Sequence, residues 1–411
     1  MKVSIENLGP IKGADLELGD VTIVIGPNAS GKSFLSTLFF SLFKDNVPPK
    51  IIRRYKKIPE IKQGEININS LITEVEGILS LAFKYSLERT FGTKYKNLIT
   101  FNEKSSKILF SNDMGEILIE MGEDFRVKVT LNKELHAVIN YIEDDKLPIG
   151  QIASNVKVKD SISSISIIYG SQPIDIPLKV DENLLKLLAF GSLINAFLAQ
   201  FFHGYFPTVF LPTERNLAIS NFIGYLSRSL ITKIPNNVDK PSVRLYLNML
   251  LQSMLALRGK KFEIKLGNDE IIYEIKEPFL LEIYNKDGSK IPISLLSSGY
   301  SQVIPLDILV KRGRFVIIEE PELNLHAGAQ VDIANYLSSL KNKKMFITTH
   351  SDIFTIQMAI NHVKKKEETL NIYLLNKGTV QKIEYTEKGD VEEIPTITDV
   401  IRNQVKEIYG E

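Results

Sequence analysis

Residues 21–33 read VTIVIGPNASGKS, and this stretch decides the fold of the chain. Its first five residues are apolar or β-branched, which is typical of a strand in the centre of a sheet. Its last eight residues, Gly26 to Ser33, fit the pattern G-x-x-x-x-G-K-[ST] without a mismatch. A Leu- and Phe-rich helical pattern follows as far as Phe43. Because the motif requires a strand before it and a helix after it, the stretch predicts a phosphate-binding loop rather than a chance glycine-rich turn.

The chemistry of such a loop follows from its backbone and from three of its residues. Consecutive loop amides and the positive end of the helix form a nest for a triphosphate. Gly31 lets the backbone approach closely, Lys32 reaches the β- and γ-phosphates, and the Ser33 hydroxyl ligates Mg²⁺. We therefore expect a nucleoside triphosphate and magnesium to bind here, the nucleotide being held by Gly26, Asn28, Ala29, Ser30, Gly31, Lys32 and Ser33.

A second buried strand carries the acidic partner that such a loop needs. Residues 315–318 are Phe-Val-Ile-Ile, and Glu319 and Glu320 follow them directly. We expect Glu319 to hold the Mg²⁺ shell together with Ser33, and Glu320 to polarise the attacking water as the catalytic base. A glutamate pair that merely begins a helix is the alternative. The four apolar residues immediately before the pair make that alternative weak.

Composition excludes several other kinds of chemistry. The chain has 411 residues, no Cys and five scattered His, which excludes disulfide frameworks, thiolate metal sites and cysteine catalysis. Fifty basic and forty-nine acidic residues give a net charge of +1, so a strongly basic nucleic-acid binder is not indicated. Local basic runs, such as 53–57 and 341–344, are either phosphate-backbone contacts or solvated faces. The near-zero net charge favours solvated faces.

One apolar segment tests the expectation of a cytoplasmic protein without a membrane partner. The N-terminus begins in strand-like sequence and lacks the pattern of a signal peptide. Residues 187–202 (LLAFGSLINAFLAQFF) are about as long as a marginal membrane span, but Ser192, Asn195 and Gln200 interrupt them. The sequence therefore favours a buried helix over a membrane span.

Four further motifs resemble those of ABC-type ATPases. Leu296–Tyr300 (LSSGY) looks like the signature motif, and Glu319–His326 (EEPELNLH) resembles the Walker B and D-loop run of the soluble branch. Ile347–Ser351 (ITTHS) is similar to that branch's switch-histidine motif, and Ile5–Ile11 (IENLGPI) is typical of the same group. The chain resembles RecF-like and SMC-like ATPases. The closest resemblance is to the AAA-type ATPase domain of overcoming-lysogenization-defect-like (OLD-like) proteins that lack the Toprim nuclease.

This resemblance implies a homodimer that forms around two ATP molecules. Each site would combine one subunit's phosphate loop with the other subunit's signature, so that Ser297, Ser298 and Gly299 contact the γ-phosphate. His350 would be a catalytic residue beside Glu320 and Lys32, bonding the γ-phosphate or the attacking water. Ser298 stands where the family usually has Gly, so a simple helix cap at Ser298-Gly299 remains open. A core or capping role for His350 also remains open.

The expected fold class is α/β: an ABC-type P-loop ATPase head with a mainly parallel core sheet, an antiparallel β subdomain and a helical and β insertion. We expect residues 1–45 and 206–411 to form the head and residues 46–205 to be the insertion. Arg215 lies either near the nucleotide or a partner, or on the surface.

The expected function is Mg-dependent ATP hydrolysis in DNA metabolism or mobile-element defence, with DNA or an effector protein as partner. An ATP-gated protein-assembly module is the alternative, and a transporter ATPase subunit is disfavoured by the divergent signature.

Overall fold

The structure is a computed structural model that describes most of the chain. The described residues are 1–43, 47–144, 152–159, 162–170, 182–216, 240–266, 269–276, 280–365, 368–391 and 395–410. The sequence from Asn216 to Leu257 has a helical pattern that a polar loop interrupts, and it lies partly outside these ranges. Within them, α7 runs from Pro241 to Ala256.

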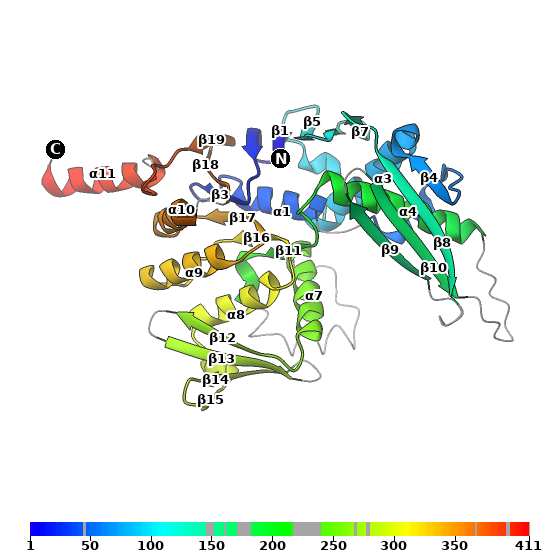
Figure 1. Cartoon of the computed structure of the whole chain (residues 1–411). Coiled ribbons are helices and arrows are strands. Elements are labelled where there is room, and N and C mark those ends of the chain that lie inside the picture. Colours follow the sequence, from blue (N-terminus) through cyan, green and yellow to red (C-terminus); the bar gives the residue numbers. More distant parts are fainter. Residues whose placement is uncertain are drawn as a thin grey trace.

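An eleven-stranded sheet forms the centre of the protein (Figure 1). In spatial order its strands are β11 (Thr208–Leu211), β16 (Phe315–Glu319), β17 (Lys344–Thr349), β3 (Val21–Ile25), β18 (Leu370–Asn376), β19 (Thr379–Ile383), β2 (Ile11–Glu17), β1 (Lys2–Leu8), β5 (Ser106–Asn112), β6 (Gly115–Met121) and β7 (Phe125–Leu131).

The first five strands of this order are parallel, and most of the others are antiparallel. β11, β16, β17, β3 and β18 pair in parallel. All five residues of β3 are buried, which is why its sequence contains only apolar and β-branched residues. From β2 to β7 every neighbouring pair is antiparallel. The predicted α/β class, with a parallel core and an antiparallel subdomain, is confirmed.

Helix α1 (Lys32–Phe43) attaches the phosphate loop to the core through its aromatic side chains. The Phe39 ring packs against Phe346 of β17 at 4.7 Å between centroids, and the Phe40 ring stacks on Phe210 of β11 at 4.8 Å. Each such pair adds to the hydrophobic burial of its rings. The beginning of α1 is therefore fixed relative to the carboxyl ends of the parallel strands.

Residues 46–205 contribute to two different parts of the fold. Strands β5 to β7 extend the main sheet, with helix α3 (Ile72–Phe91) packed on β7. Strands β4 (Gly64–Asn67), β8 (His136–Asp144), β10 (Ile162–Gly170) and β9 (Ile152–Lys159) form a separate four-stranded sheet. The short helix α2 (Pro49–Arg54) contacts both α3 and α4 (Glu182–Phe201). The division of the chain at residues 46 and 205 stays a prediction.

Helix α4 (Glu182–Phe201) contains the apolar segment considered above. By length and composition alone it could cross a membrane, but it packs on β9 and β10, and 56% of its most apolar window is buried within the protein. Phe190, Leu193 and Phe197 have no exposed surface. This burial supports the interpretation as a core helix.

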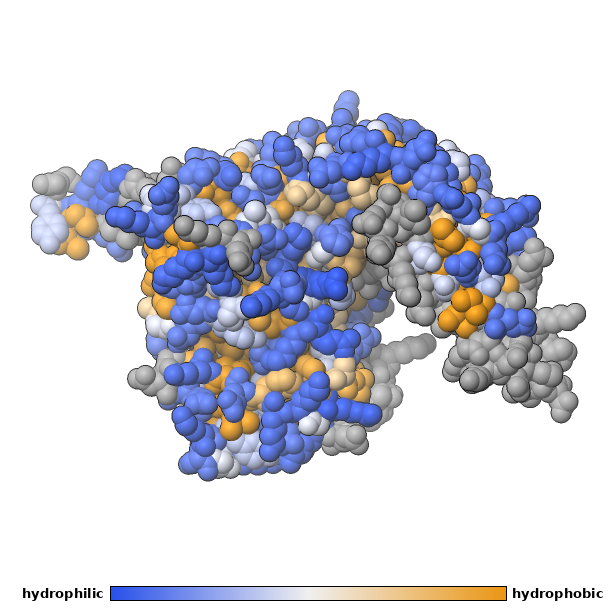
Figure 2. Space-filling model, in the orientation of Figure 1, coloured by the Kyte–Doolittle hydropathy of each residue, from blue (hydrophilic) through white to orange (hydrophobic). Residues whose placement is uncertain are grey.

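Among the described residues from Lys261 onward, the chain adds a small antiparallel sheet and the helices α8 to α11. The sheet contains β12 (Lys261–Leu266), β13 (Asp269–Lys276), β14 (Leu280–Asn285) and β15 (Lys290–Ile291). The helices are α8 (Ser298–Val310), α9 (Ala327–Ser339), α10 (Asp352–Lys365) and α11 (Pro395–Tyr409). Figure 1 shows α11 projecting away from the body at the C-terminus. Figure 2 shows a face dominated by hydrophilic residues, with apolar residues in small groups.

Candidate nucleotide site

Two positions of the phosphate loop, Gly26 and Gly31, require glycine. Gly31 has a φ of 109°, in the region that favours glycine. A Cβ added at Gly26 would lie 2.2 Å from the carbonyl oxygen of Leu375 in β18. The neighbouring strand therefore restricts the first position of the motif, and backbone conformation restricts the sixth.

Lys32 lies inside the loop that it belongs to. Its ammonium group donates to the carbonyl oxygens of Gly26 and Pro27, both at 2.9 Å. Burial lowers the pKa of Lys32 to about 8, although the nearby carboxylates of Glu320, Glu322 and Glu319 act in the opposite direction. Of the other expected loop residues, Asn28, Ala29 and Ser33 are exposed and Ser30 is buried.

Strand register brings the other expected groups to the same edge of the sheet. Ile25 of β3 pairs with Thr349 of β17, and Glu319 of β16 pairs with Thr348. Gly26 directly follows Ile25 in the sequence, and His350 directly follows Thr349. Carboxyl ends of parallel strands are where open α/β sheets bind ligands.

Glu319 is a buried carboxylate with one oxygen left free for a cation. Its side chain ends β16, and the residue is 4% exposed. The Oε2 atom accepts a hydrogen bond from the amide of Thr213 at 3.3 Å, whereas Oε1 has no partner among the described residues. Burial raises the pKa of Glu319 to about 8. These features fit a magnesium ligand, because an uncompensated buried oxygen favours a cation.

The described residues hold no group of three or more metal-binding side chains. Mg²⁺ is commonly bound by one or two carboxylates together with substrate phosphates and water. A single buried Glu319 beside the phosphate loop is consistent with that mode of binding.

Glu320 and His350 face each other across the ends of β16 and β17. The distance from Glu320 Oε1 to His350 Nε2 is 3.6 Å. Glu320 has a positive φ of 45°, and its amide donates to the carbonyl of Thr348 at 2.7 Å. Burial, assisted by the charge of Lys32, lowers the pKa of His350, which favours the neutral form of its imidazole. A neutral imidazole can either donate or accept one hydrogen bond.

Glu322 was not anticipated from the sequence as part of this site. Its Oε1 accepts a hydrogen bond from the amide of His350 at 2.8 Å, and burial raises its pKa above the usual value. It therefore links the loop after β16 to the end of β17. Its position two residues after the expected base was the signal available in the sequence.

Arg215 has no exposed surface, so the surface interpretation of this residue is wrong. Its guanidinium donates to the main-chain carbonyl of Glu319 at 2.6 Å and to that of Glu320 at 2.7 Å. The hydroxyl of Tyr246 in α7 donates to the carbonyl of Arg215 at 2.9 Å. Arg215 follows β11, the parallel neighbour of β16, which explains how it reaches these carbonyls.

The signature residues lie apart from the phosphate loop of the same chain. Ser297 caps α8, and its hydroxyl accepts a hydrogen bond from the amide of Tyr300 at 3.5 Å. The cap that the sequence left open was at Ser298-Gly299, but α8 begins at Ser298, so both residues lie in its first turn. Ser298 is exposed, and a Cβ added at Gly299 would lie 3.1 Å from Leu325 in the loop after β16. In Figure 1, β11 and β16 lie between α1 and α8.

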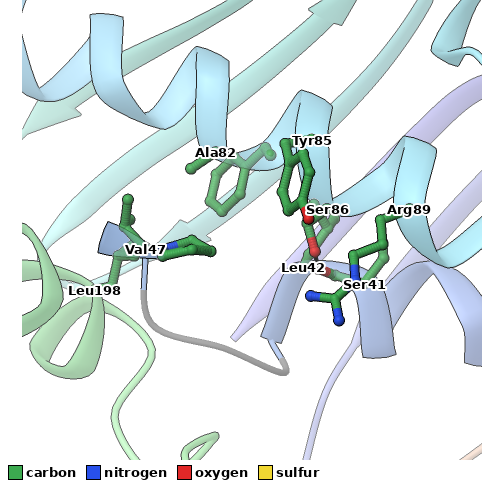
Figure 3. Close-up of a pocket in the computed structure, with 10 residues that line it drawn as sticks. Ser41, Leu42, Val47, Ala82, Tyr85, Ser86, Arg89 and Leu198 are labelled. Atoms are coloured by element: carbon green, nitrogen blue, oxygen red, sulfur yellow. Dashed lines mark hydrogen bonds between the residues drawn. The ribbon is translucent and has the colours of Figure 1, made fainter. Parts of the chain in front are cut away.

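A separate small cavity lies at the opposite end of α1. It has a volume of about 20 Å³ and is lined by Ser41 and Leu42 of α1, Ala82 and Ser86 of α3, and Leu198 of α4, among others (Figure 3). This is room for about one water molecule, so the cavity does not hold a nucleotide.

The glycine-rich loop joins the central parallel strand β3 to a helix. A carboxylate pair lies at the end of β16, which is separated from β3 in the sheet by β17. This is the arrangement of a P-loop nucleotide site. Residues 218–355 match the family model described as AAA ATPase domain. The match covers Glu319, Glu320 and His350 but not the phosphate loop, and it supports an ATPase. No curated protein is similar enough to count as a match.

Several solved structures are distantly similar to this chain. The SMC head domain from Thermotoga maritima has 13% identity and a TM-score of 0.38, covering 94% of this chain and 98% of that one. The Smc head domain bound to the C-terminal domain of ScpA, derived from Pyrococcus furiosus, has 12% identity, a TM-score of 0.39 and coverages of 98% and 99%. The recombination mediator protein RecF with ATP has 12% identity, a TM-score of 0.33 and coverages of 93% and 98%.

Proposed function

We propose that this chain is a Mg-dependent, ATP-hydrolysing ABC-type ATPase. The observation that supports this most strongly is the meeting of Lys32, Glu319, Glu320 and His350 at the carboxyl ends of β3, β16 and β17. The loop amides and Lys32 bind the phosphates. Glu320 accepts the proton of the attacking water, and the neutral His350 orients that water or the γ-phosphate.

Magnesium, held by Glu319 and the Ser33 hydroxyl, supplies charge neutralisation for the phosphates. The protein's own contribution is to position the groups around the phosphates and to keep Glu319 out of bulk water. The free Oε1 atom of Glu319 supports this assignment.

Equilibrium binding and phosphate release test this proposal. Wild-type protein is expected to bind Mg-ATP and to release phosphate slowly. Lys32→Ala is expected to lose both binding and turnover, because the ammonium is the only side-chain cation of the phosphate loop. The matched control Lys12→Ala, an exposed lysine in β2, should leave both unchanged. Equal ATP affinity in Lys32→Ala and wild type would contradict the proposal.

We further propose that two copies form a dimer around two ATP molecules. Support comes from the exposed signature: Ser297 and Ser298 face solvent, and the preceding Leu295 is 74% exposed. An exposed leucine beside solvent-facing hydroxyl groups suits a surface that a second subunit covers. Sizing of Glu320→Gln should give the mass of a dimer with Mg-ATP and of a monomer without it. A mass that is independent of ATP would argue against the dimer.

A protein-assembly module gated by ATP is the second candidate. The altered signature favours it: Tyr300 is 8% exposed and its hydroxyl has no partner among the described residues. In that case ATP binding assembles a complex with an effector protein and hydrolysis only resets it. The same partner set with and without ATP would exclude this function.

A cytoplasmic role in DNA metabolism or mobile-element defence, as in OLD-like proteins, rests on the motif resemblance alone. Two lysines of the basic run 341–344 are engaged within the chain. Lys344 pairs with Asp20 at 3.1 Å, and the ammonium of Lys343 contacts the carbonyl of Gly313. Adding duplex DNA to the sizing experiment tests this role, because a DNA-binding dimer should elute earlier with DNA present.

A further inference from the structure

Gln330 lies near the beginning of α9, and its side-chain amide joins two segments of the chain. Its Nε2 atom donates a hydrogen bond to the carbonyl of Leu325 at 2.9 Å. Its Oε1 atom accepts a hydrogen bond from the hydroxyl of Ser351 at 2.6 Å. Leu325 belongs to the loop that contains Glu320, and Ser351 directly follows His350. One side chain therefore bridges the segments that carry the expected base and the expected switch histidine.

The chemistry of its two partners fixes the orientation of the Gln330 amide. A main-chain carbonyl can only accept, so the NH2 group must face Leu325 and the oxygen must face Ser351. The Ser351 hydroxyl that donates to Gln330 also accepts a hydrogen bond from the amide of Phe354 at 3.0 Å, which caps the beginning of α10. The position of the Ser351 side chain is therefore specified from two sides.

His350 is bonded to the loop after β16 at a second point. Its amide donates a hydrogen bond to Oε1 of Glu322 at 2.8 Å. Pairing of β17 with β3 extends only as far as Thr349, so sheet pairing no longer fixes the main chain at His350. The bonds to Glu322 and, through Ser351, to Gln330 hold it instead. Both of these side chains come from the segment that follows β16.

We propose that Gln330 is a positioning residue for ATP hydrolysis, which keeps the imidazole of His350 in place beside Glu320. The inference rests on the proposed ATPase function, because it assigns Gln330 a role in that reaction. The two side chains are 3.6 Å apart but come from different strands, so their separation depends on how the ends of β16 and β17 are joined. Gln330 makes that connection through Ser351. A displacement of about 1 Å in such a group can cost about 100-fold in rate.

Gln330→Met tests this role, because methionine has a similar length, cannot donate to Leu325 and accepts only weakly. We expect kcat to fall about 10-fold, while the dissociation constant of Mg-ATP changes by less than about threefold. Gln357→Met is the matched control. Gln357 also joins α10 to α9, which lie side by side (Figure 1), and its Nε2 atom donates to Asn335 at 3.0 Å. Because Gln357 lies farther along α10, its substitution should leave both quantities unchanged.

Variants of Ser351 show whether the effect passes through its bond to Gln330. Ser351→Thr keeps a hydroxyl that can also cap α10, and should keep kcat within about threefold of wild type. Ser351→Ala should lower kcat, and adding Gln330→Met to it should lower kcat no further, because the bond is already lost. Losses that multiply in the double variant would mean that the two residues act independently, and would overturn the proposal.

The imidazole of His350 reports its own position independently of turnover. The chain has five His, so the NMR signal of His350 in histidine-labelled protein can be assigned from its loss in His350→Gln. The chemical shift of this signal should change in Gln330→Met and keep its wild-type value in Gln357→Met. An unchanged shift in Gln330→Met would overturn the proposal even if kcat were reduced, because the imidazole would not have moved.

The kinetic outcomes separate an error in this role from an error in the proposed function. Equal kcat in Gln330→Met and wild type overturns the positioning role and leaves the ATPase in place. Equal losses in Gln330→Met and Gln357→Met also overturn it, because the packing of α9 on α10 would then be what matters. Absence of phosphate release from the wild type overturns the proposed function and the positioning role together.

Discussion

The guanidinium of Arg215 donates a hydrogen bond to the main-chain carbonyl of Glu319 over 2.6 Å. A second bond, at 2.7 Å, reaches the carbonyl of Glu320, whose positive φ is uncommon for a residue with a side chain. Such a conformation costs of order 1–3 kcal/mol and persists only where the surroundings hold it. Arg215, together with the bond from the Glu320 amide to the carbonyl of Thr348, therefore holds the main chain of the expected catalytic base in this conformation.

Replacing Arg215 by lysine tests this positioning role. A compact ammonium cannot reach both carbonyls in the fixed geometry of a guanidinium fork. We expect kcat for ATP hydrolysis to fall by about 10- to 100-fold, while the dissociation constant of ATP changes by less than about threefold. Rapid-quench kinetics and equilibrium binding measure the two quantities separately.

Tyr246→Phe is the matched control for that substitution. It removes the hydrogen bond from Tyr246 to the carbonyl of Arg215 but leaves the guanidinium in place. It should lower the free energy of unfolding by about 1 kcal/mol without reducing kcat. Equal losses of kcat in Arg215→Lys and Tyr246→Phe would mean that Arg215 has a purely structural role.

Glu319→Gln should change the magnesium dependence of hydrolysis. The substitution exchanges the carboxylate, including its free Oε1 atom, for a neutral carboxamide. A carboxamide is a weaker ligand for a hard cation than a carboxylate. The Mg²⁺ concentration for half-maximal turnover should rise at least about 10-fold, a size typical of damage to a metal site. A titration of Mg²⁺ at fixed ATP measures it. An unchanged midpoint would remove Glu319 from the metal site.

Gly26→Ala should disturb both the loop and the sheet beside it. The added methyl group would lie 2.2 Å from the carbonyl oxygen of Leu375, which is backbone and cannot move away cheaply. We expect a loss of about 2 kcal/mol or more in the free energy of unfolding, together with loss of ATP binding. Gly13→Ala is the control, because nothing lies within 4 Å of its added Cβ. Denaturant unfolding of the two variants gives the comparison.

Asp20 connects the beginnings of three parallel strands and gives a prediction about pH. Partial burial raises its pKa, but the amide of Thr369 and the ion pair with Lys344 outweigh this and hold the pKa below 3.8. A lowered pKa stabilises the fold above the pKa of the unfolded chain, and this stabilisation is lost as the pH falls through the folded pKa.

Asp20→Asn should therefore melt at a lower temperature than wild type at pH 7, by an amount equivalent to about 1 kcal/mol. The difference should shrink as the pH is lowered from about 4 towards 3. Thermal melting of both proteins across this range measures the effect. A difference that is constant between pH 7 and pH 3 would contradict it.

The parts of the fold that were predictable from sequence are those with local signals. β3 was expected at residues 21–25 because a run of apolar and β-branched residues precedes a phosphate loop, and the structure has that strand at those residues. The pairing of β1 with β5, which sets Val3 opposite Phe110, joins segments about one hundred residues apart. No local pattern specifies such a pairing, because either strand could pair with another of the same alternation.

The same contrast applies to the candidate site. The phosphate loop and the two glutamates carry a motif with a fixed spacing, so each residue could be named in advance. Arg215 carries none, and its burial depends on how distant strands meet. Arginine is usually a surface residue, so this position lies against the usual preference and could be recognised only from the fold.

Hydrolysis of Mg-ATP by wild type and by Glu320→Gln tests the central claim most directly. Phosphate release and the amount of bound ATP should be measured in the same samples at saturating Mg-ATP. The account predicts that wild type turns over slowly, that Glu320→Gln loses at least about 100-fold in rate, and that the variant retains full occupancy by ATP. Equal rates in the two proteins would contradict the account, because the carboxylate of Glu320 would then take no part in the chemistry.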